Sequence, residues 1–138
     1  MKQFSDTIYS RMFLISAIWN LYFSLGSIVM PGLSLKLAFG ADVARDVLNN
    51  YYAYTFYNFM SLSVLIFGAG YYIVSRDVNK NRGIVLLGLA GKLIFFTYYT
   101  VSYFTSHCTI LMFLTVAGDF IFSILFGYFL VQKIKSDR

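Results

Sequence analysis

The sequence predicts an all-α integral membrane protein: an antiparallel bundle of four transmembrane helices, with a short outer interfacial helix between the first two spans. One reason is composition, because the 138-residue chain is 59% hydrophobic and 12% charged, whereas soluble domains carry roughly 25% charged residues. The other is length, since the uncharged stretches form four segments near the ~20 residues that cross ~30 Å of hydrocarbon. Barrel strands would be about 10 residues long and alternate in polarity, so a single helical domain over residues 1–138 is expected.

The four spans are expected at about residues 12–30, 54–75, 83–104 and 109–131. Pro31 and Gly32 end the first, as is typical of a helix stop. The short connections "SRDVNKNRG" (75–83) and "FTSHCT" (104–109) make the later spans antiparallel neighbours. The alternative for the first segment is a cleaved signal peptide ending near "AFG" (38–40). Its 19 residues exceed the ~7–15 of a signal core, and Asn20 interrupts it, so retention as a span is favoured.

Between the first two spans, "LSLKLAFGADVARDVL" (33–48) alternates apolar with charged residues. This pattern predicts one or two short helices lying in the outer interface of the membrane. Tyrosines gather at the same level, at positions 51, 52, 54 and 57 and again at 98, 99 and 103. Such grouping is typical of the aromatic belt at a membrane–water boundary.

Basic residues separate by side of the membrane. Eight of the eleven lysines and arginines fall at the termini and in the 76–82 turn: Lys2, Arg11, Arg76, Lys80, Arg82, Lys133, Lys135 and Arg138. By the positive-inside rule, both termini are expected in the cytoplasm of a bacterial cell, with the chain in its inner (cytoplasmic) membrane. Nucleic acid is not an expected partner, because the net charge of +5 does not form a basic face on a soluble module.

Each span carries small or polar residues at helical spacing. The stripe of the first span includes Ser16, Asn20 and Ser24, and that of the fourth includes Thr115 and Asp119. We expect the four stripes to face one another, with the Phe, Leu and Ile faces toward lipid. Glycines and serines alone would indicate helix packing and no further role.

Lys92 and Asp119 differ from the rest of these stripes, because a charge at the bilayer centre costs about 2.5–3.5 kcal/mol and usually marks a functional site. Counting along the helices puts their heights about 6 Å apart, so direct contact is geometrically feasible. The same counting puts Asn20 near Lys92, Ser24 near Asp119, and a further group nearer the outer face. The predicted ligand- or proton-binding set is Lys92, Asp119, Asn20, Asn58, Tyr99, Ser24 and Thr115.

Two hypotheses for function remain open. In the first, the bundle encloses a polar, outward-opening cavity that binds or conducts a small ligand or protons around the Lys92–Asp119 centre. In the second, the chain is an accessory or structural subunit of a membrane complex, and this pair only fixes helix register. The expected partners are the lipid bilayer, a small-molecule or lipophilic ligand, and a membrane-protein partner or second copy.

An enzyme is the less favoured hypothesis. A desolvated Lys92 could act as a base or nucleophile, but Asp119 is the sole candidate for a second catalytic group. His107 and Cys108 are the single histidine and cysteine of the chain, so no paired histidine ligation, dithiol chemistry or multi-ligand metal site is available from these residue types. No catalytic residue, metal site or cofactor is predicted.

Three stretches give the chain a resemblance to small bacterial four-span proteins related to DoxX. They are "GSIVMPGLSLKLAFG" (26–40) at the end of the first span, "GAGYYIVSRDVNKNRG" (68–83) at the basic turn, and "LLGLAGK" (86–92) at the opening of the third. The resemblance implies a four-helix bundle and an accessory role, which in some members is linked to quinone-dependent redox complexes. It transfers no catalytic residue.

Overall fold

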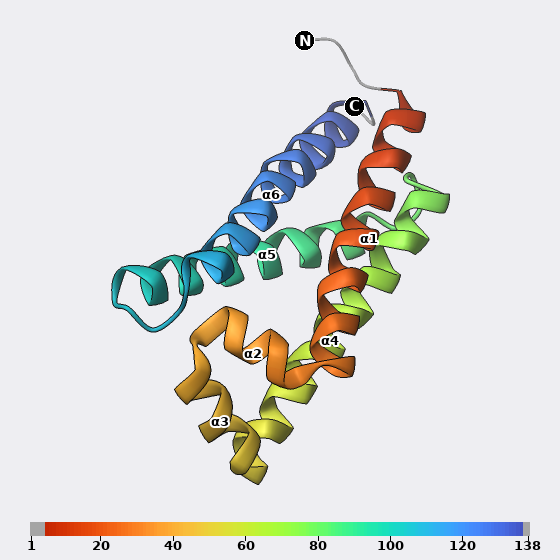
Figure 1. The fold of residues 1–138 in the computed structure, drawn as a ribbon. Coiled ribbons are helices and arrows are strands. Elements are labelled where there is room, and N and C mark those ends of the chain that lie inside the picture. Colours follow the sequence, from red (N-terminus) through yellow and green to blue (C-terminus); the bar gives the residue numbers. More distant parts are fainter. Residues whose placement is uncertain (1–4, 137–138) are drawn as a thin grey trace.

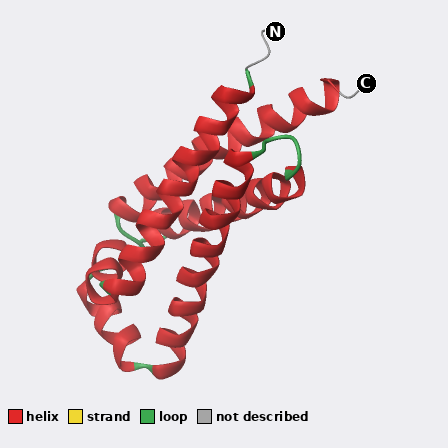
Figure 2. Cartoon of the chain, turned by 90° about the vertical axis from the view of Figure 1, so that its right-hand side faces the viewer, coloured by secondary structure: helices red, strands yellow, loops and turns green. Residues whose placement is uncertain are grey.

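The structure, a computed structural model, describes residues 5–136. These residues form six helices and no strand, joined by short loops (Figures 1 and 2): α1 (Asp6–Val29), α2 (Pro31–Phe39), α3 (Ala41–Asn49), α4 (Tyr51–Arg76), α5 (Arg82–Phe104) and α6 (Ile110–Ser136). Two basic residues used to orient the chain, Lys2 and Arg138, lie outside the described residues. The prediction of an all-helical chain is confirmed.

Helices α1, α4, α5 and α6 are each long and apolar enough to cross a membrane, which is consistent with a small multi-pass membrane protein. Some of their ends extend well beyond the predicted spans: α1 begins at Asp6 instead of near Met12, and α6 ends at Ser136 instead of near Val131. The difference has a simple cause. Hydropathy reports the apolar part of a helix, whereas backbone hydrogen bonding continues into polar residues at its ends.

The four long helices associate as two pairs, α1 with α4 and α5 with α6. The start of α1, the end of α6 and the α4–α5 turn lie at one end of the molecule, and α2 and α3 lie toward the other (Figure 1). Helices α4 and α5 contact each other less extensively, through close approaches at Gly70 and Gly88. Helix α2 packs against both α1 and α6, so it bridges the two pairs.

A buried aromatic cluster joins all four long helices near the first of these ends. The ring of Phe13 on α1 lies 4.9 Å from that of Phe126 and 5.1 Å from that of Phe129, both on α6. Tyr71 on α4 lies 5.1 Å from Phe126, and Val85 of α5 is buried in the same cluster. Ring separations of this size are typical of favourable aromatic packing.

An ion pair closes the same end. Lys133 Nζ, near the end of α6, donates to Asp6 Oδ1 at 2.6 Å, and Asn79 Nδ2 in the α4–α5 turn donates to Asp6 Oδ2 at 2.9 Å. A hydrogen bond within the turn also orders it, because the backbone N–H of Asn79 donates to the carboxylate of Asp77. The same bond lowers the pKa of the Asp77 carboxyl group. The first helix, the turn and the last helix are thereby held together.

The outer segment forms two short helices, within the predicted one or two. Pro31 opens α2, where its missing N–H leaves no helical bond unmade. Gly40 separates α2 from α3 with φ of 93°, a backbone conformation that favours glycine. In α3, Ala44 is buried, whereas Asp42 and Arg45 are exposed and pair at 3.2 Å. The location of α3 in a membrane interface remains a prediction.

Candidate functional site

Three helices bring their polar side chains together at Lys92. The ammonium group of this residue, on α5, donates to Asp119 Oδ1 on α6 at 2.5 Å and to Asn20 Oδ1 on α1 at 3.0 Å. The Lys92 side chain is 5% exposed and that of Asp119 is 17% exposed. A buried charge is tolerated when it is paired and hydrogen-bonded, and Lys92 meets both conditions. The heights of Lys92 and Asp119 in the membrane, as estimated from helical rise, are thus compatible with their direct contact.

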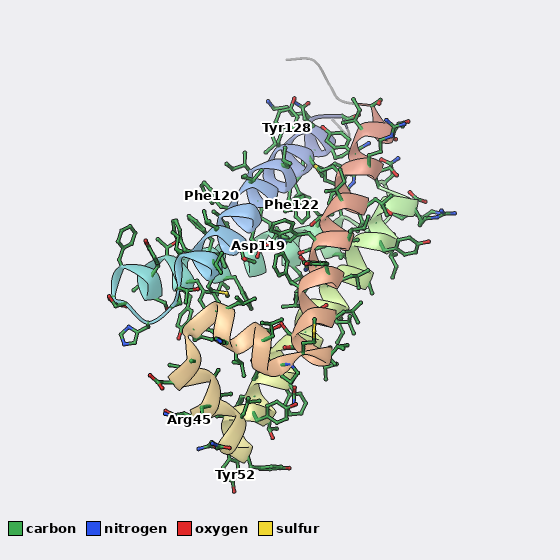
Figure 3. The ribbon with its side chains drawn as sticks, in the orientation of Figure 1. Arg45, Tyr52, Asp119, Phe120, Phe122 and Tyr128 are labelled. Carbon is green, nitrogen blue, oxygen red and sulfur yellow. The ribbon has the colours of Figure 1, made fainter. Side chains whose placement is uncertain are left out.

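Two aromatic faces complete the surroundings of the ammonium. Lys92 Nζ lies 5.3 Å from the ring centroid of Tyr71 on α4 and 5.3 Å from that of Phe122 on α6. Both distances are within the range of cation–π attraction. In Figure 3, Asp119 and Phe122 lie between α6 and α1, whereas Arg45 and Tyr52 mark the remote end of the molecule. All four long helices therefore contribute to the Lys92 site.

Glycines make room for the large side chains around this site. A Cβ at Gly88 would lie 2.5 Å from the Tyr71 ring, and a Cβ at Gly118 would lie 2.6 Å from the ring of Trp19. Real Cβ atoms do not approach rings so closely, so both positions exclude larger residues unless the rings move. Gly88 lies one turn before Lys92 and Gly118 directly precedes Asp119, which links each glycine to one member of the ion pair.

A small cavity of about 50 Å³ adjoins the ion pair, and its walls include Lys92, Asp119, Asn20, Tyr71 and Gly91. A water molecule needs roughly 10–15 Å³ of such space together with polar partners. The small cavity therefore has the size and the polar groups to hold ordered water beside the two charges.

A second cavity is much larger, about 840 Å³, and lies between the two helix pairs. Its walls come from α1, α2, α4, α5 and α6 and are mostly apolar, with Trp19, Phe23, Leu33 and Leu111 among them. This volume is within the ~300–1,000 Å³ of ordinary small-molecule sites. Asp119 and Asn20 line both cavities, whereas Lys92 lines only the small one. Asp119 and Asn20 therefore lie at the boundary between the large, mainly apolar cavity and the small cavity beside the ion pair.

The rim of the large cavity is exposed and apolar. Tyr22 and Leu25 of α1 and Leu111 and Leu114 of α6 line it while remaining substantially exposed. Helix α2 forms another wall and is held to the start of α6, because the N–H of Thr109 donates to the carbonyl of Ala38 at 2.8 Å. An opening between α1 and α6 follows from this arrangement.

The structure separates the predicted site residues into three groups. Lys92 is in direct contact with both Asp119 and Asn20. Ser24 and Thr115 line the large cavity, and each donates its hydroxyl proton to a carbonyl of its own helix. Asn58 and Tyr99 line neither cavity.

Tyr99 is buried elsewhere in the structure, with its hydroxyl 3.9 Å from Met60 Sδ and its ring 6.1 Å from that of Phe39. Asn58 is half-buried on α4. The predicted polar, outward-opening cavity thus differs from the geometry, in which a mainly apolar cavity has polar groups at its boundary.

Four functional candidates were not found from the sequence: Tyr71 and Phe122 beside the ammonium, Trp19 in the wall of the large cavity, and Phe95, which lines both cavities. Each is an aromatic residue in a helix already rich in them, so the pattern offers no polar contrast to distinguish it. The neighbouring glycines were the available signal, since Gly88 receives the Tyr71 ring and Gly118 receives Trp19.

The part of the chain that the structure describes contains no group of three histidine, cysteine or acidic side chains arranged to hold a metal ion. Cys108 is half-buried, and burial raises the pKa of its thiol. No protein-family model, curated protein or solved structure matches this chain. The resemblance to DoxX-related proteins therefore remains a prediction.

Proposed function

We propose that this chain is a small bacterial inner-membrane protein that binds a small lipophilic ligand in the large cavity, with the Lys92–Asp119 pair at the polar end of the site. In this proposal α1, α4, α5 and α6 cross the bilayer as an antiparallel bundle. Both chain termini are in the cytoplasm, and α2 and α3 lie at the outer surface.

The observation that carries the proposal is the position of Asp119. The carboxylate of Asp119 contacts the buried ammonium of Lys92, and the same residue lines the 840 Å³ cavity. A pair that served only to fix helix register would have no need of a chamber beside it. Intramembrane ionisable residues usually face a cavity and mark a ligand or ion pathway, and this pair fits that description.

The distribution of charge supports the proposed orientation. Arg11, Arg76, Lys80 and Lys133 belong to the end where α1 begins and α6 finishes. Basic residues within about 15–20 residues of a span favour the cytoplasmic side. In this orientation the exposed apolar rim between α1 and α6 faces hydrocarbon, so a ligand would reach the cavity from the bilayer.

The test uses Trp19, which is the single tryptophan of the chain and lines the cavity. The probe is para-bromophenethyl alcohol, whose bromine quenches tryptophan fluorescence at short range. Saturable quenching is expected in the purified full chain reconstituted in lipid nanodiscs. The blocking variant is Gly26→Phe, because Gly26 lines the cavity and a Cβ there meets open space.

The matched control is Gly127→Phe, since Gly127 also lies within a long helix with open space at its Cβ but lines neither cavity. Loss of saturable quenching in Gly26→Phe, with retention in Gly127→Phe, would support a ligand site. Equal linear quenching in all three proteins would mean that the probe reaches Trp19 only by dissolving in lipid, which would favour the accessory-subunit hypothesis.

A further inference from the structure

The two members of the ion pair are not equally available to a ligand. Asp119 and Asn20 line the large cavity, whereas Lys92 lines only the small one. The Lys92 ammonium is covered by Asp119 Oδ1, Asn20 Oδ1 and two aromatic rings. A molecule in the large cavity would therefore meet the carboxylate before the ammonium.

Three hydroxyl groups on the cavity wall are left with their oxygens as hydrogen-bond acceptors. Ser24 and Thr115 donate their hydroxyl protons to the carbonyls of Leu21 and Leu111, and Ser61 does the same within α4. The oxygens of these hydroxyls remain free to accept. Within residues 5–136, the contacts of the Asp119 carboxylate are made through Oδ1, which leaves Oδ2 for a further donor. The wall therefore offers acceptors to a ligand that donates, while Asn20, whose Oδ1 accepts from Lys92, keeps its amide N–H groups to donate to the oxygen of the same ligand.

The charge of the site is already balanced. Among the described residues, Asp119 is the one charged residue that lines the large cavity, and Lys92 neutralises it. A carboxylate or phosphate ligand would add a second anion beside Asp119, and an ammonium ligand would leave a net positive charge. In a site of low dielectric constant, either excess charge is strongly unfavourable.

We infer that the ligand is a neutral amphiphile whose hydroxyl group donates to Asp119 and whose apolar body fills the large cavity. This inference rests on the proposed function and specifies its ligand class as an alcohol, in preference to an acid or an amine. The apolar walls formed by α1, α2 and α6 hold the body, and the hydrogen bond to a charged acceptor fixes the head group.

The experiment compares three probes with one shared skeleton: para-bromophenethyl alcohol, para-bromophenylacetate and para-bromophenethylammonium. Each is titrated in nanodiscs against the full chain and against the variants Asp119→Asn and Lys92→Met, with Trp19 quenching as the readout. Because nanodisc composition is constant, differences in partitioning between probes are the same for every protein. Only a change in preference between proteins reports on the site.

The unmodified chain should bind the alcohol at least about tenfold more tightly than either ion, after correction with the cavity-blocked Gly26→Phe protein. Asp119→Asn leaves Lys92 without its anion, so the preference should shift about tenfold or more toward the carboxylate probe. Lys92→Met leaves Asp119 without its cation, and its preference should shift toward the ammonium probe. Each protein would thus select the head group that restores a neutral site.

The outcomes separate this inference from the proposed function. A preference of the unmodified chain for the carboxylate or the ammonium, with Gly26→Phe still blocking, would overturn the alcohol inference and leave the ligand site standing. Unchanged preferences in both charge variants would overturn it too. If neither variant folds, the order of affinity of the unmodified chain for the three probes still tests the alcohol inference. Absence of Gly26-sensitive quenching with every probe would reject the proposed function itself.

Discussion

The Lys92–Asp119 pair should show strong energetic coupling, and the structure sets the size of each effect. Removing one member of a buried ion pair typically destabilises a protein by about 3–5 kcal/mol. Lys92→Met leaves a carboxylate that is 17% exposed beside a cavity able to hold water, so a loss near the lower end, about 3 kcal/mol, is expected. Asp119→Leu leaves an ammonium that is 5% exposed, and a loss near the upper end, about 5 kcal/mol, is expected.

The double variant, Lys92→Met with Asp119→Leu, removes both charges together. Replacing a whole buried pair with apolar groups is often neutral or better, so it should lie within about 1 kcal/mol of the unmodified protein. Independent effects would sum to about 8 kcal/mol. The assay is equilibrium unfolding in mixed micelles titrated with dodecyl sulfate, followed by circular dichroism. Additive losses in the double variant would refute the coupling and remove the main support for a shared site.

Stability and binding must be measured separately in the double variant. It loses the hydrogen bond from ligand to Asp119, so it should fold yet bind para-bromophenethyl alcohol about tenfold more weakly. Undiminished binding together with full stability would mean that the pair acts only in helix packing.

The remaining predictions concern topology, packing and reactivity. A periplasm-active reporter such as alkaline phosphatase should be active at Asp42 and inactive at the C-terminus; the reverse result would invert the proposed orientation. With Cys108 replaced by serine, a cysteine introduced at Asp42 should react with a water-soluble maleimide, whereas one at Val43, which is apolar and exposed in the structure, should be protected by the membrane; equal labelling would contradict an interfacial α3. Gly88→Ala should destabilise by about 1–3 kcal/mol because its Cβ would meet the Tyr71 ring, while Gly127→Ala should be tolerated. Burial raises the pKa of the Cys108 thiol, so less thiolate is present at a given pH. The rate at which Cys108 is alkylated should therefore keep rising above the pH of ~8.5 near which a free cysteine is half ionised. An alkylation rate that follows the titration curve of a free cysteine would contradict this prediction.

Much of the fold was predictable from the sequence because transmembrane helices give strong signals of length and polarity. The contact of Lys92 with Asp119 and Asn20 was within reach of simple counting, since helical rise converts sequence position into height. The same method assigned Asn58, Tyr99 and Thr115 to one common height nearer the outer face. Height does not determine which way a residue faces around its helix, however, and of these three only Thr115 lines a cavity.

The apolar chamber could not be predicted in the same way. Its volume depends on how the α1–α4 and α5–α6 pairs separate and on how α2 bridges them, which are tertiary features without a local signature. Trp19, Tyr71 and Phe122 were missed because an aromatic residue that faces lipid and one that faces the interior of the protein look alike in the sequence of a uniformly apolar helix. Glycines opposite large rings, as at Gly88 and Gly118, are the most useful local clue.

The central claim is that a ligand occupies the large cavity with its polar end at Asp119, and photo-crosslinking tests it most directly. The probe is an aliphatic alcohol that carries a diazirine next to its hydroxyl group, irradiated with the full chain in nanodiscs and followed by peptide mass spectrometry. A saturable adduct is predicted on Asp119, or within residues 19–30 and 111–116, which contain the other cavity-lining residues of α1 and α6. It should be competed by para-bromophenethyl alcohol and absent from Gly26→Phe but not from Gly127→Phe. Adducts spread over exposed residues such as Phe56 and Ile94, without competition and unchanged in Gly26→Phe, would contradict the claim.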